Sequence, residues 1–340
     1  MQFYMAPMEG LTGYIFRNAY EKHYGGIARY FTPFLTNKKM NHRELNDILP
    51  EHNRGMEVVP QVLTNRADDF CCIAGQLREY GYETVNLNLG CPSGTVVAKN
   101  RGAGFLAFPD ELDAFLDEIF SRCPSKISVK TRIGRDTPAE WERLLAIYEK
   151  YPLEELIIHP RVQKDFYKNT VNLEAYGLAE RMSRHVLCYN GDLGTAEDYR
   201  DRHERFPGTE RMMLGRGLLK NPGLIEEIWY SKYAYKPEKR QNLQKGVQPP
   251  DMPETQGVPV SHDTGQKKIR LRAFHDDLLL GYQTVMSGDR PTLFKMKELW
   301  VYLGESFSNP EKYLKKIKKT ERIREYELIV DALFREGELR

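Results

Sequence analysis

Cys91 is the side chain in this sequence best placed to exchange a proton with a bound substrate. It follows the run 83–89, in which apolar and polar residues alternate, and Gly90 and Pro92 then interrupt that pattern. Such a run predicts a β-strand that ends in a turn. The thiol therefore lies at a strand-to-loop corner, where a side chain can meet a substrate. A buried structural thiol is the commoner role of a single cysteine, so other parts of the chain must decide between the two roles.

Short apolar, β-rich runs alternate with segments able to form helices over the first two-thirds of the chain. This alternation predicts an α/β fold, a (β/α)8 TIM barrel. In that fold catalytic groups gather at the C-terminal ends of the strands, and phosphate is often bound after strands seven and eight. The eight predicted strands are Phe3–Pro7, Ile27–Phe34, Met56–Leu63, Thr84–Leu89, Lys126–Arg132, Glu155–His159, His185–Asn190 and Arg211–Leu214.

The rest of the chain predicts an all-helical domain, because the alternation stops after Pro222. The segment 236–268 differs from its surroundings, since it holds five prolines and no aromatic residue. That composition predicts a flexible insertion, after which helices resume at Ile269. The predicted domains are thus a catalytic barrel over 1–225 and a helical domain over 226–340.

Small-residue turns follow predicted strands seven and eight. They read Asn190-Gly191-Asp192 and Gly215-Arg216-Gly217. Such turns leave backbone N–H groups available, and Arg216 adds a cation, as a terminal phosphate requires. Either turn alone is also typical of an ordinary surface loop. Together, at the phosphate corner of a barrel, they favour a mononucleotide cofactor.

Lys130 places a long cation within the apolar run 127–131. A charge there must reach an anion or water at the barrel mouth. It can be a surface lysine, a Schiff-base lysine, or a cation that faces the negative charge of a reduced flavin. For His159, too, both a structural role and a ligand-binding role are open. Its place at a strand end, before Pro160 and Arg161, favours ligand binding.

Length and composition limit the class of protein. The 340 residues suit a barrel of about 250 residues with a smaller second domain. The five cysteines include no CxxC pair, which argues against a disulfide framework or a zinc site and favours the cytoplasm. No apolar run is long enough for a membrane span, and the N-terminus does not resemble a secretory signal. The net charge of +2 means that any nucleic-acid footprint must be local.

Six segments occur along the chain in a distinctive order. They are MAPMEGLTGYIFR, NLNLGCPSGTVVAKNRGAGFL, VKTRIG, IIHPRVQKDFY, YNGD and MLGRGLLKNP. In order and spacing they resemble the bacterial type of the tRNA-dihydrouridine synthase family. The resemblance is close up to about residue 225 and looser over the helical remainder. It implies an FMN-dependent enzyme that uses NADPH to reduce the C5–C6 double bond of a specific uridine in tRNA.

The resemblance also implies a role for individual residues. Cys91 would protonate the uracil, and Asn88 would orient that base. The other substrate-binding residues would be Arg17, Lys99, Arg101 and Arg161. Cofactor contacts would come from Pro7 and Met8 beneath the flavin ring, Gln61 at its pyrimidine edge, Lys130 and His159 at its polar side and ribityl region, and Asn190, Gly191, Asp192, Gly215 and Arg216 around the phosphate.

The sequence departs from the family pattern at two places. Pro160 follows His159 where glycine is frequent, and this change affects the adjacent loop while leaving the implied cofactor roles intact. The insertion at about 236–268 leaves open how the helical domain meets tRNA.

The implied reaction needs a hydride at one uracil carbon and a proton at the other. In this mechanism reduced FMN gives a hydride to C6, Cys91 supplies the proton near C5, and Lys130 stabilises charge on the flavin. Affinity for tRNA must come from phosphate contacts. The stretch Arg270–His275 offers modest support for RNA binding. The strongest basic cluster, predicted on a helix whose Leu314, Ile317 and Ile323 turn inward, comprises Lys312, Lys315, Lys316, Lys318, Lys319, Arg322 and Arg324.

Three alternatives remain open from the sequence. A flavin barrel that acts on a free pyrimidine or an enone would share the cofactor residues without needing the basic helices. A non-enzymatic RNA-binding or chaperone-like protein would keep the fold but bind no flavin. An aldolase-type barrel would use Lys130 as a Schiff base. The sequence indicates no obligate protein partner, and it does not specify the target uridine or the oligomeric state.

Overall fold

The structure is a computed structural model that describes residues 1–234 and 263–340, with the side chains of 233 and 234 left out. Its contacts divide the chain into two compact units, each discontinuous in sequence. The barrel unit comprises Met1–Glu9, Ala28–Asp192 and Asp201–Leu214, and the helical unit comprises Gly10–Ile27, Leu193–Arg200 and Gly215–Arg340. The predicted domains, in contrast, are continuous stretches that meet at residue 225.

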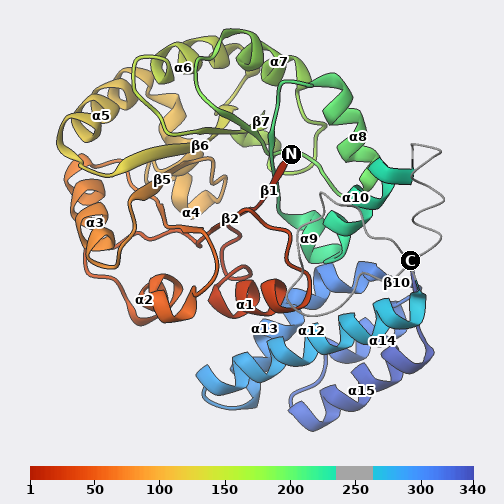
Figure 1. Cartoon of the computed structure of the whole chain (residues 1–340). Helices are drawn as coiled ribbons and strands as arrows, with labels where there is room; N and C mark the ends of the chain where they lie inside the picture. The colour runs from red at the N-terminus through yellow and green to blue at the C-terminus, as the bar shows by residue number, and fades with distance from the viewer. Residues whose placement is uncertain (235–262) are drawn as a thin grey trace. The chain divides into compact units, whose positions relative to one another are not determined.

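The barrel unit contains one sheet of nine parallel strands (Figure 1). The strands are β1 Gln2–Met5, β2 Arg29–Phe31, β3 Val58–Val59, β4 Gln61–Val62, β5 Thr84–Leu89, β6 Lys126–Gly134, β7 Leu156–Val162, β8 Leu187–Tyr189 and β9 Arg211–Leu214. β3 pairs with β2 and β4 pairs with β5, while Pro60 separates these two short strands. They are therefore the halves of the predicted third strand, and the predicted TIM barrel with a helical C-terminal region is confirmed.

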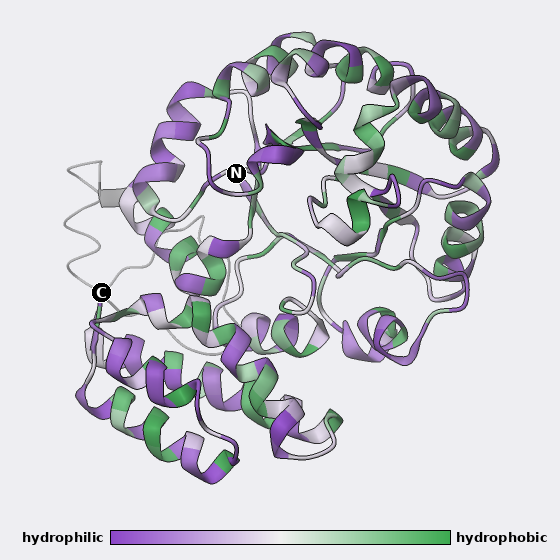
Figure 2. Cartoon of the chain, turned by 180° about the vertical axis from the view of Figure 1, so that it is seen from behind, coloured by the Kyte–Doolittle hydropathy of each residue, from purple (hydrophilic) through white to green (hydrophobic). Residues whose placement is uncertain are grey.

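The longer helices of the barrel unit bury an apolar face. In α5, for example, the buried side chains are Leu112, Phe115, Leu116 and Ile119. Figure 2 shows the resulting mixture of hydrophobic and hydrophilic residues on the helices around the strands. These helices are α2 His42–Ile48, α3 Ala67–Glu79, α4 Gly94–Val97, α5 Pro109–Arg122, α6 Trp141–Tyr148 and α7 Leu173–Met182, and α8 Ala196–Arg205 is divided between the two units.

β6 and β7 extend beyond their predicted ends. Their pairing continues past Arg132 and His159 to Gly134 and Val162, with a shift in register before the last pair. His159 consequently lies within β7 rather than at a strand end, and Lys130 lies within β6, as in the predicted strand. Side chains of consecutive strand residues point to opposite faces, so the parity of each position decides whether it faces the barrel interior.

An apolar cluster fills the interior of the barrel below its mouth. Its members are Tyr4, Ala6, Phe31, Val59, Ile157, Cys188 and Met213, all at most 5% exposed. Residues two positions further along a strand point to the same side. The next inward positions after Val59, Ile157 and Cys188 are therefore the polar residues Gln61, His159 and Asn190. The apolar cluster thus forms the floor beneath a polar layer.

The helical unit includes a helix from the N-terminal region. In α1 the rings of Phe16 and Tyr20 pack against Phe274 of α12 at centroid distances of 5.6 and 6.4 Å. This aromatic packing explains why α1 groups with the C-terminal helices. The unit contains α1 Tyr14–His23, α9 Arg216–Lys220, α10 Leu224–Ala234, α12 Thr264–Val285, α13 Asp289–Leu303, α14 Glu311–Ile317, α15 Ile323–Glu336 and the short strands β10 Phe307–Ser308 and β11 Glu338–Leu339.

Most of the predicted insertion, 236–268, lies outside the described residues. Its described end is helical, because α12 begins at Thr264 rather than at the predicted Ile269. The Asp263 side chain accepts a hydrogen bond from the Gly265 N–H at 2.9 Å, which caps the earlier start. Over the described part of the chain, no helix is both long enough and apolar enough to span a membrane.

Candidate active site

Asn88 fixes the turn that holds Cys91. The Asn88 Oδ1 atom accepts hydrogen bonds from the backbone N–H groups of Gly90 and Cys91, both at 2.9 Å. Its Nδ2 atom donates to Oε1 of Gln61 at 2.6 Å. This contact links the end of β5 to β4, so two residues predicted to contact substrate and cofactor are joined directly.

The peptide groups around Cys91 are also held from the opposite side. Arg132 Nε donates to the Gly90 carbonyl at 2.9 Å, and Gln163 Nε2 donates to the Pro92 carbonyl at 3.1 Å. The other nitrogens of Arg132 donate to the carbonyls of Val162 and Phe166 at 2.9 and 2.8 Å. The sequence-based residue set omitted Arg132 and Gln163, although both fix the corner that carries the thiol.

Gly102 closes the loop beneath Cys91. Its φ angle is +55°, and a Cβ atom there would lie 2.9 Å from the Cys91 carbonyl oxygen. Both the backbone angle and the contact exclude a larger residue without displacement. The neighbouring Ala103 N–H donates to the same oxygen at 3.1 Å. The loop and the thiol corner are therefore built as one structure.

We expect the Gly102→Ala variant to lose about 1–3 kcal/mol of folding free energy, because alanine is strained at a positive φ angle and crowds the Cys91 carbonyl. Denaturant unfolding measures the change. Gly94→Ala is the matched control in the same loop, since a Cβ atom at Gly94 meets no atom within 4 Å. Equal stability of the two variants would contradict the close packing of this loop.

Cys91 is half-buried, and its environment favours the protonated form of the thiol. Burial raises the pKa of Cys91, and the Glu9 carboxylate raises it further. The Ser93 backbone N–H, Lys130 and Arg132 act in the opposite direction, but the net pKa change is upward. A thiol of raised pKa is suited to donate a proton and is a poor nucleophile at neutral pH.

Lys130 lies level with Asn88 in the paired strands β5 and β6. Burial, assisted by the positive charge of Arg132, lowers the pKa of Lys130 to about 8. No carboxylate among the described residues forms an ion pair with this ammonium. A buried cation without a protein counter-ion is suited to an anionic ligand. The site therefore fits a cofactor that carries negative charge.

Arg161 contacts both Asp192 and His159. Arg161 is 2% exposed, and its guanidinium makes a two-pronged ion pair with Asp192, with Nη1 3.0 Å from Oδ1 and Nη2 donating to Oδ2. Its Nη1 atom also lies 3.3 Å from His159 Nε2. Arginine only donates, so Nε2 accepts and the proton of a neutral ring lies on Nδ1.

The contacts of Arg161 concern two predictions: that Arg161 binds substrate and that Asp192 binds cofactor. The Arg161 guanidinium also donates to the Asn169 carbonyl at 2.6 Å, so protein groups already engage it on several sides. Its direct contact with substrate, and that of Asp192 with cofactor, remain predictions. In the structure Arg161 lies between Asp192 and His159, which is 7% exposed.

The predicted phosphate residues lie after β8 and β9. The Asn190 side chain donates to the Met213 carbonyl at 2.8 Å and so ties β8 to β9. A Cβ atom at Gly191 would lie 2.3 Å from the Tyr189 hydroxyl, so a larger residue there would require the Tyr189 ring to move. Gly215 directly follows β9, and Arg216 is the first residue of α9 in the helical unit. Phosphate binding by these residues stays a prediction.

The remaining predicted residues differ in accessibility. Pro7 and Met8 follow β1 and are half-buried, while Lys99 is exposed and Arg101 half-buried in the loop after β5. Arg17 is fully buried in α1, and its guanidinium donates to the Thr12 carbonyl at 3.1 Å. The prediction that Arg17 contacts RNA is therefore corrected, because its side chain is withdrawn from solvent.

The stretch Arg270–His275 also contributes little to an RNA surface. Arg270 and His275 are buried, and Arg272 pairs with Asp276 and Asp331 at 2.8 and 2.5 Å. The residues look like a basic and aromatic RNA track in sequence, but in the structure they pack and pair within the helical unit.

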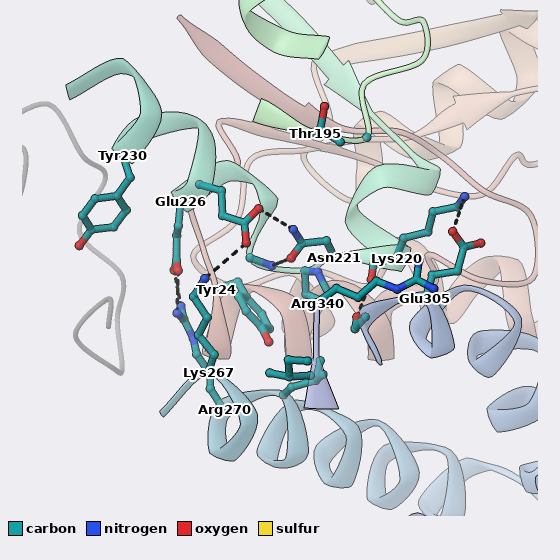
Figure 3. Close-up of a pocket in the computed structure, with 17 residues that line it drawn as sticks. Tyr24, Thr195, Lys220, Asn221, Glu226, Tyr230, Lys267, Arg270, Glu305 and Arg340 are labelled. Carbon is teal, nitrogen blue, oxygen red and sulfur yellow. Dashed lines mark hydrogen bonds and ion pairs between the residues drawn. The ribbon is translucent and has the colours of Figure 1, made fainter. Parts of the chain in front are cut away.

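A separate cavity of about 320 Å³ lies within the helical unit (Figure 3). Its charged side chains neutralise one another, as Arg270 pairs with Glu226 at 2.5 Å and Lys220 pairs with Glu305 at 2.8 Å. The described residues that line it include none of those predicted for chemistry. The candidate active site is therefore assigned to the mouth of the barrel and not to this cavity.

Comparison with known proteins identifies the family of this chain. The sequence description of the family "Dihydrouridine synthase (Dus)" matches residues 4–256. The chain is 30% identical over 238 residues to the tRNA-dihydrouridine(16) synthase of Pseudomonas putida, which covers 67% of this chain and 73% of that protein. It is 26% identical over 237 residues to the probable tRNA-dihydrouridine synthase of Staphylococcus aureus, covering 66% and 70%. The chain belongs to the dihydrouridine synthase family, as its motifs predicted.

Among solved structures, morphinone reductase in complex with tetrahydroNAD aligns with 68% of this chain and 86% of its own length. The TM-score is 0.46 and the sequence identity is 10%.

Proposed function

We propose that this protein is a tRNA-dihydrouridine synthase that reduces the C5–C6 double bond of a uridine in tRNA, using FMN and NADPH in the cytoplasm. The observation that supports this proposal best is the position of Cys91, whose backbone N–H donates to Asn88 at the mouth of the barrel. Burial raises the pKa of this thiol, and among the described residues no carboxylate pairs with the nearby Lys130 ammonium. Family membership supports the substrate class and the type of reaction.

Several residues of the site fit a bound FMN. Lys130 offers a cation that no carboxylate of the described residues pairs with, and Gln61 offers a carboxamide at the same mouth. We propose that Asn190, Gly191, Gly215 and Arg216 contact the phosphate, with Pro7 and Met8 beneath the ring. When bound, FMN supplies the hydride exchange that the reduction needs, and NADPH is the external source of electrons.

Residues of the protein supply the proton to the uracil base and hold the proton donor in position. Cys91 donates the Sγ proton to C5 of the uracil, and the resulting thiolate must recover a proton from solvent before the next turnover. Asn88 and Arg132 hold the peptide groups on either side of the thiol, so the Sγ atom needs little reorganisation. A flipped uridine is required, because a stacked base cannot reach the barrel mouth.

The test is reduction of transcribed tRNA by the purified protein. The expected result is a yellow protein that oxidises NADPH and forms dihydrouridine in tRNA, detected by mass spectrometry of nuclease digests. Free uridine and a simple enone are assayed in parallel. Turnover of either small substrate without turnover of tRNA would contradict the proposal and favour a small-molecule flavin barrel. A protein that binds no flavin would favour the non-enzymatic alternative.

We propose that the basic segment, Lys312, Lys315, Lys316, Lys318, Lys319, Arg322 and Arg324, contacts the tRNA backbone. These side chains are exposed, while Ile317 is buried. The segment is not the single helix that was predicted, because α14 ends at Ile317 and α15 starts at Ile323. Lys312 lies 3.8 Å from Glu336, whereas none of Lys315, Lys316, Lys318 and Lys319 forms an ion pair within the described residues.

We expect the double variant Lys315→Glu, Lys319→Glu to bind tRNA about tenfold or more weakly and to lower the salt dependence of binding by about two counter-ions. Filter binding at several salt concentrations measures both quantities. The control is Arg54→Glu, Lys126→Glu, which makes the same change in charge at exposed positions near the amino ends of β3 and β6. Equal weakening in both variants would show that only net charge matters and would contradict the assignment.

A further inference from the structure

Two buried residues outside the predicted site continue the hydrogen-bond chain that begins at Cys91. Asn86 and Ser128 are 0% and 1% exposed, and both point into the barrel below Asn88 and Lys130. Gln61 Nε2 donates to Asn86 Oδ1 at 2.7 Å, and Asn86 Nδ2 donates to Ser128 Oγ at 2.8 Å. The chain of contacts therefore runs from the thiol corner through three carboxamides to a hydroxyl.

The direction of this chain is set at its upper end. The N–H groups of Gly90 and Cys91 can only donate, so the Asn88 atom that faces them must be the carbonyl oxygen. Asn88 then presents its NH₂ group to Gln61, and Gln61 presents its own NH₂ group to Asn86. Reversing one amide would bring two oxygens or two NH₂ groups together, because every contact depends on the previous one.

This order of hydrogen bonds fixes which atoms of the Gln61 carboxamide donate and which accept. Its Oε1 atom accepts from Asn88, and one proton of Nε2 is used by Asn86. The second proton of Nε2 remains as the hydrogen-bond donor that Gln61 can offer to a ligand. The pyrimidine edge of a flavin carries two carbonyl oxygens on either side of the N3–H group, and these oxygens require donors.

We propose that Asn86 and Ser128 are positioning residues that hold the Gln61 carboxamide with its N–H toward the cofactor and so set the affinity for FMN. This inference rests on the proposed function, since it takes FMN as the ligand of Gln61. Neither residue reaches the base or the cofactor itself. Each acts through its hydrogen bond to the next member of the chain, and Ser128 accepts the last N–H at the lower end.

The simpler explanation is that these bonds only satisfy polar groups that happen to be buried. Buried polar groups are nearly always paired, so the presence of the bonds does not separate the two explanations. The two differ in what a substitution changes. A purely structural role lowers stability alone, whereas a positioning role lowers FMN affinity more than an equally buried hydrogen bond elsewhere in the same sheet.

The test compares Asn86→Leu, Ser128→Ala and Ser128→Thr with Thr131→Val as the matched control. Thr131 is equally buried on β6, but its hydroxyl lies 2.9 Å from the Tyr148 hydroxyl, on the side of the strand that faces the helices. FMN affinity is measured by quenching of flavin fluorescence as the apoprotein is titrated. The position of the visible flavin band is recorded for each complex.

We expect FMN affinity to fall about tenfold in Asn86→Leu and about threefold in Ser128→Ala, from typical single hydrogen-bond contributions, and to stay within twofold of wild type in Ser128→Thr and Thr131→Val. Affinity in Asn86→Leu equal to that of Thr131→Val would overturn the proposal. If Asn86→Leu does not fold, the ratio of Ser128→Ala to Ser128→Thr decides, and a ratio of one overturns it. Failure of the wild-type protein to bind FMN would instead refute the proposed function, so the two failures are distinct.

Discussion

Replacing Cys91 with alanine is expected to lower the rate of dihydrouridine formation by about 10²–10⁴, the usual contribution of a positioned general acid. FMN content and NADPH oxidation should remain close to wild type, because Cys91 is assigned to the base and not to the cofactor. The backbone around residue 91 is held by Asn88, Arg132 and Gly102, which the substitution leaves in place. Single-turnover reduction of tRNA by pre-reduced protein measures the effect without interference from the NADPH step.

Cys123→Ala is the matched control for this prediction. Cys123 is also a half-buried free thiol, but it lies at the end of α5, away from the mouth of the barrel. The control should reduce tRNA at the wild-type rate. A Cys91→Ala protein that reduces tRNA as fast as the control would remove Cys91 from the acid role.

The raised pKa of Cys91 has a consequence for the pH dependence of the same reaction. Because the folded protein favours the protonated thiol, the acid stays available through neutral and mildly alkaline pH. The Cys91 thiol is therefore expected to lose its proton, and the reaction to slow, only at a pH above the range in which an ordinary cysteine ionises. Thiolate formation can be followed independently from the alkylation rate of the peptide that contains Cys91.

Local sequence patterns were sufficient to predict the strands that carry Gln61 and His159. Alternation along the strands places Gln61 two positions beyond Val59, and His159 two positions beyond Ile157, on the same side as the buried cluster. Motif order then assigned roles to these positions. The fold class could be predicted for the same reason, since each strand and each helix carries its own periodicity.

Contacts between distant segments could not be predicted in this way. Arg132 holds the carbonyl of Gly90, 42 residues earlier, and Gln163 holds the carbonyl of Pro92, 71 residues earlier. Neither pairing leaves a local pattern in the sequence. The chain from Gln61 through Asn86 to Ser128 was missed for the same reason, although the polar residues within apolar strands were a visible signal.

Burial of charged residues was the other source of error. Arg17 was predicted to contact RNA, yet it is fully buried in α1, a helix that packs against α12 of the same unit. Arg270 is similarly shielded from solvent, and its guanidinium forms an ion pair with Glu226. A basic residue near an aromatic one therefore predicts an RNA contact only after its packing is known. Lys315 and Lys319 are exposed and remain consistent with the predicted surface.

Replacing Lys130 with methionine is expected to weaken FMN binding by about tenfold to a hundredfold at pH 7, the range for loss of a charged hydrogen-bond partner. The effect should itself depend on pH. The pKa of Lys130 is lowered to about 8, so the ammonium is lost as the pH rises through that value in the protein without ligand. Wild-type affinity for an anionic cofactor should therefore fall above about pH 8, whereas the methionine variant should show no such step.

The sign of the stability effect is opposite to that of the affinity. A lysine whose pKa is lower in the folded than in the unfolded chain makes the folded state bind fewer protons, so stability rises with pH between about 8 and the normal lysine value. Wild-type protein without cofactor should thus gain stability over the interval in which it loses FMN affinity. Lys126→Met is the control, because Lys126 is the exposed first residue of the same strand and should alter neither profile. Equal FMN affinity of wild type and Lys130→Met at pH 7 would exclude Lys130 from the cofactor site.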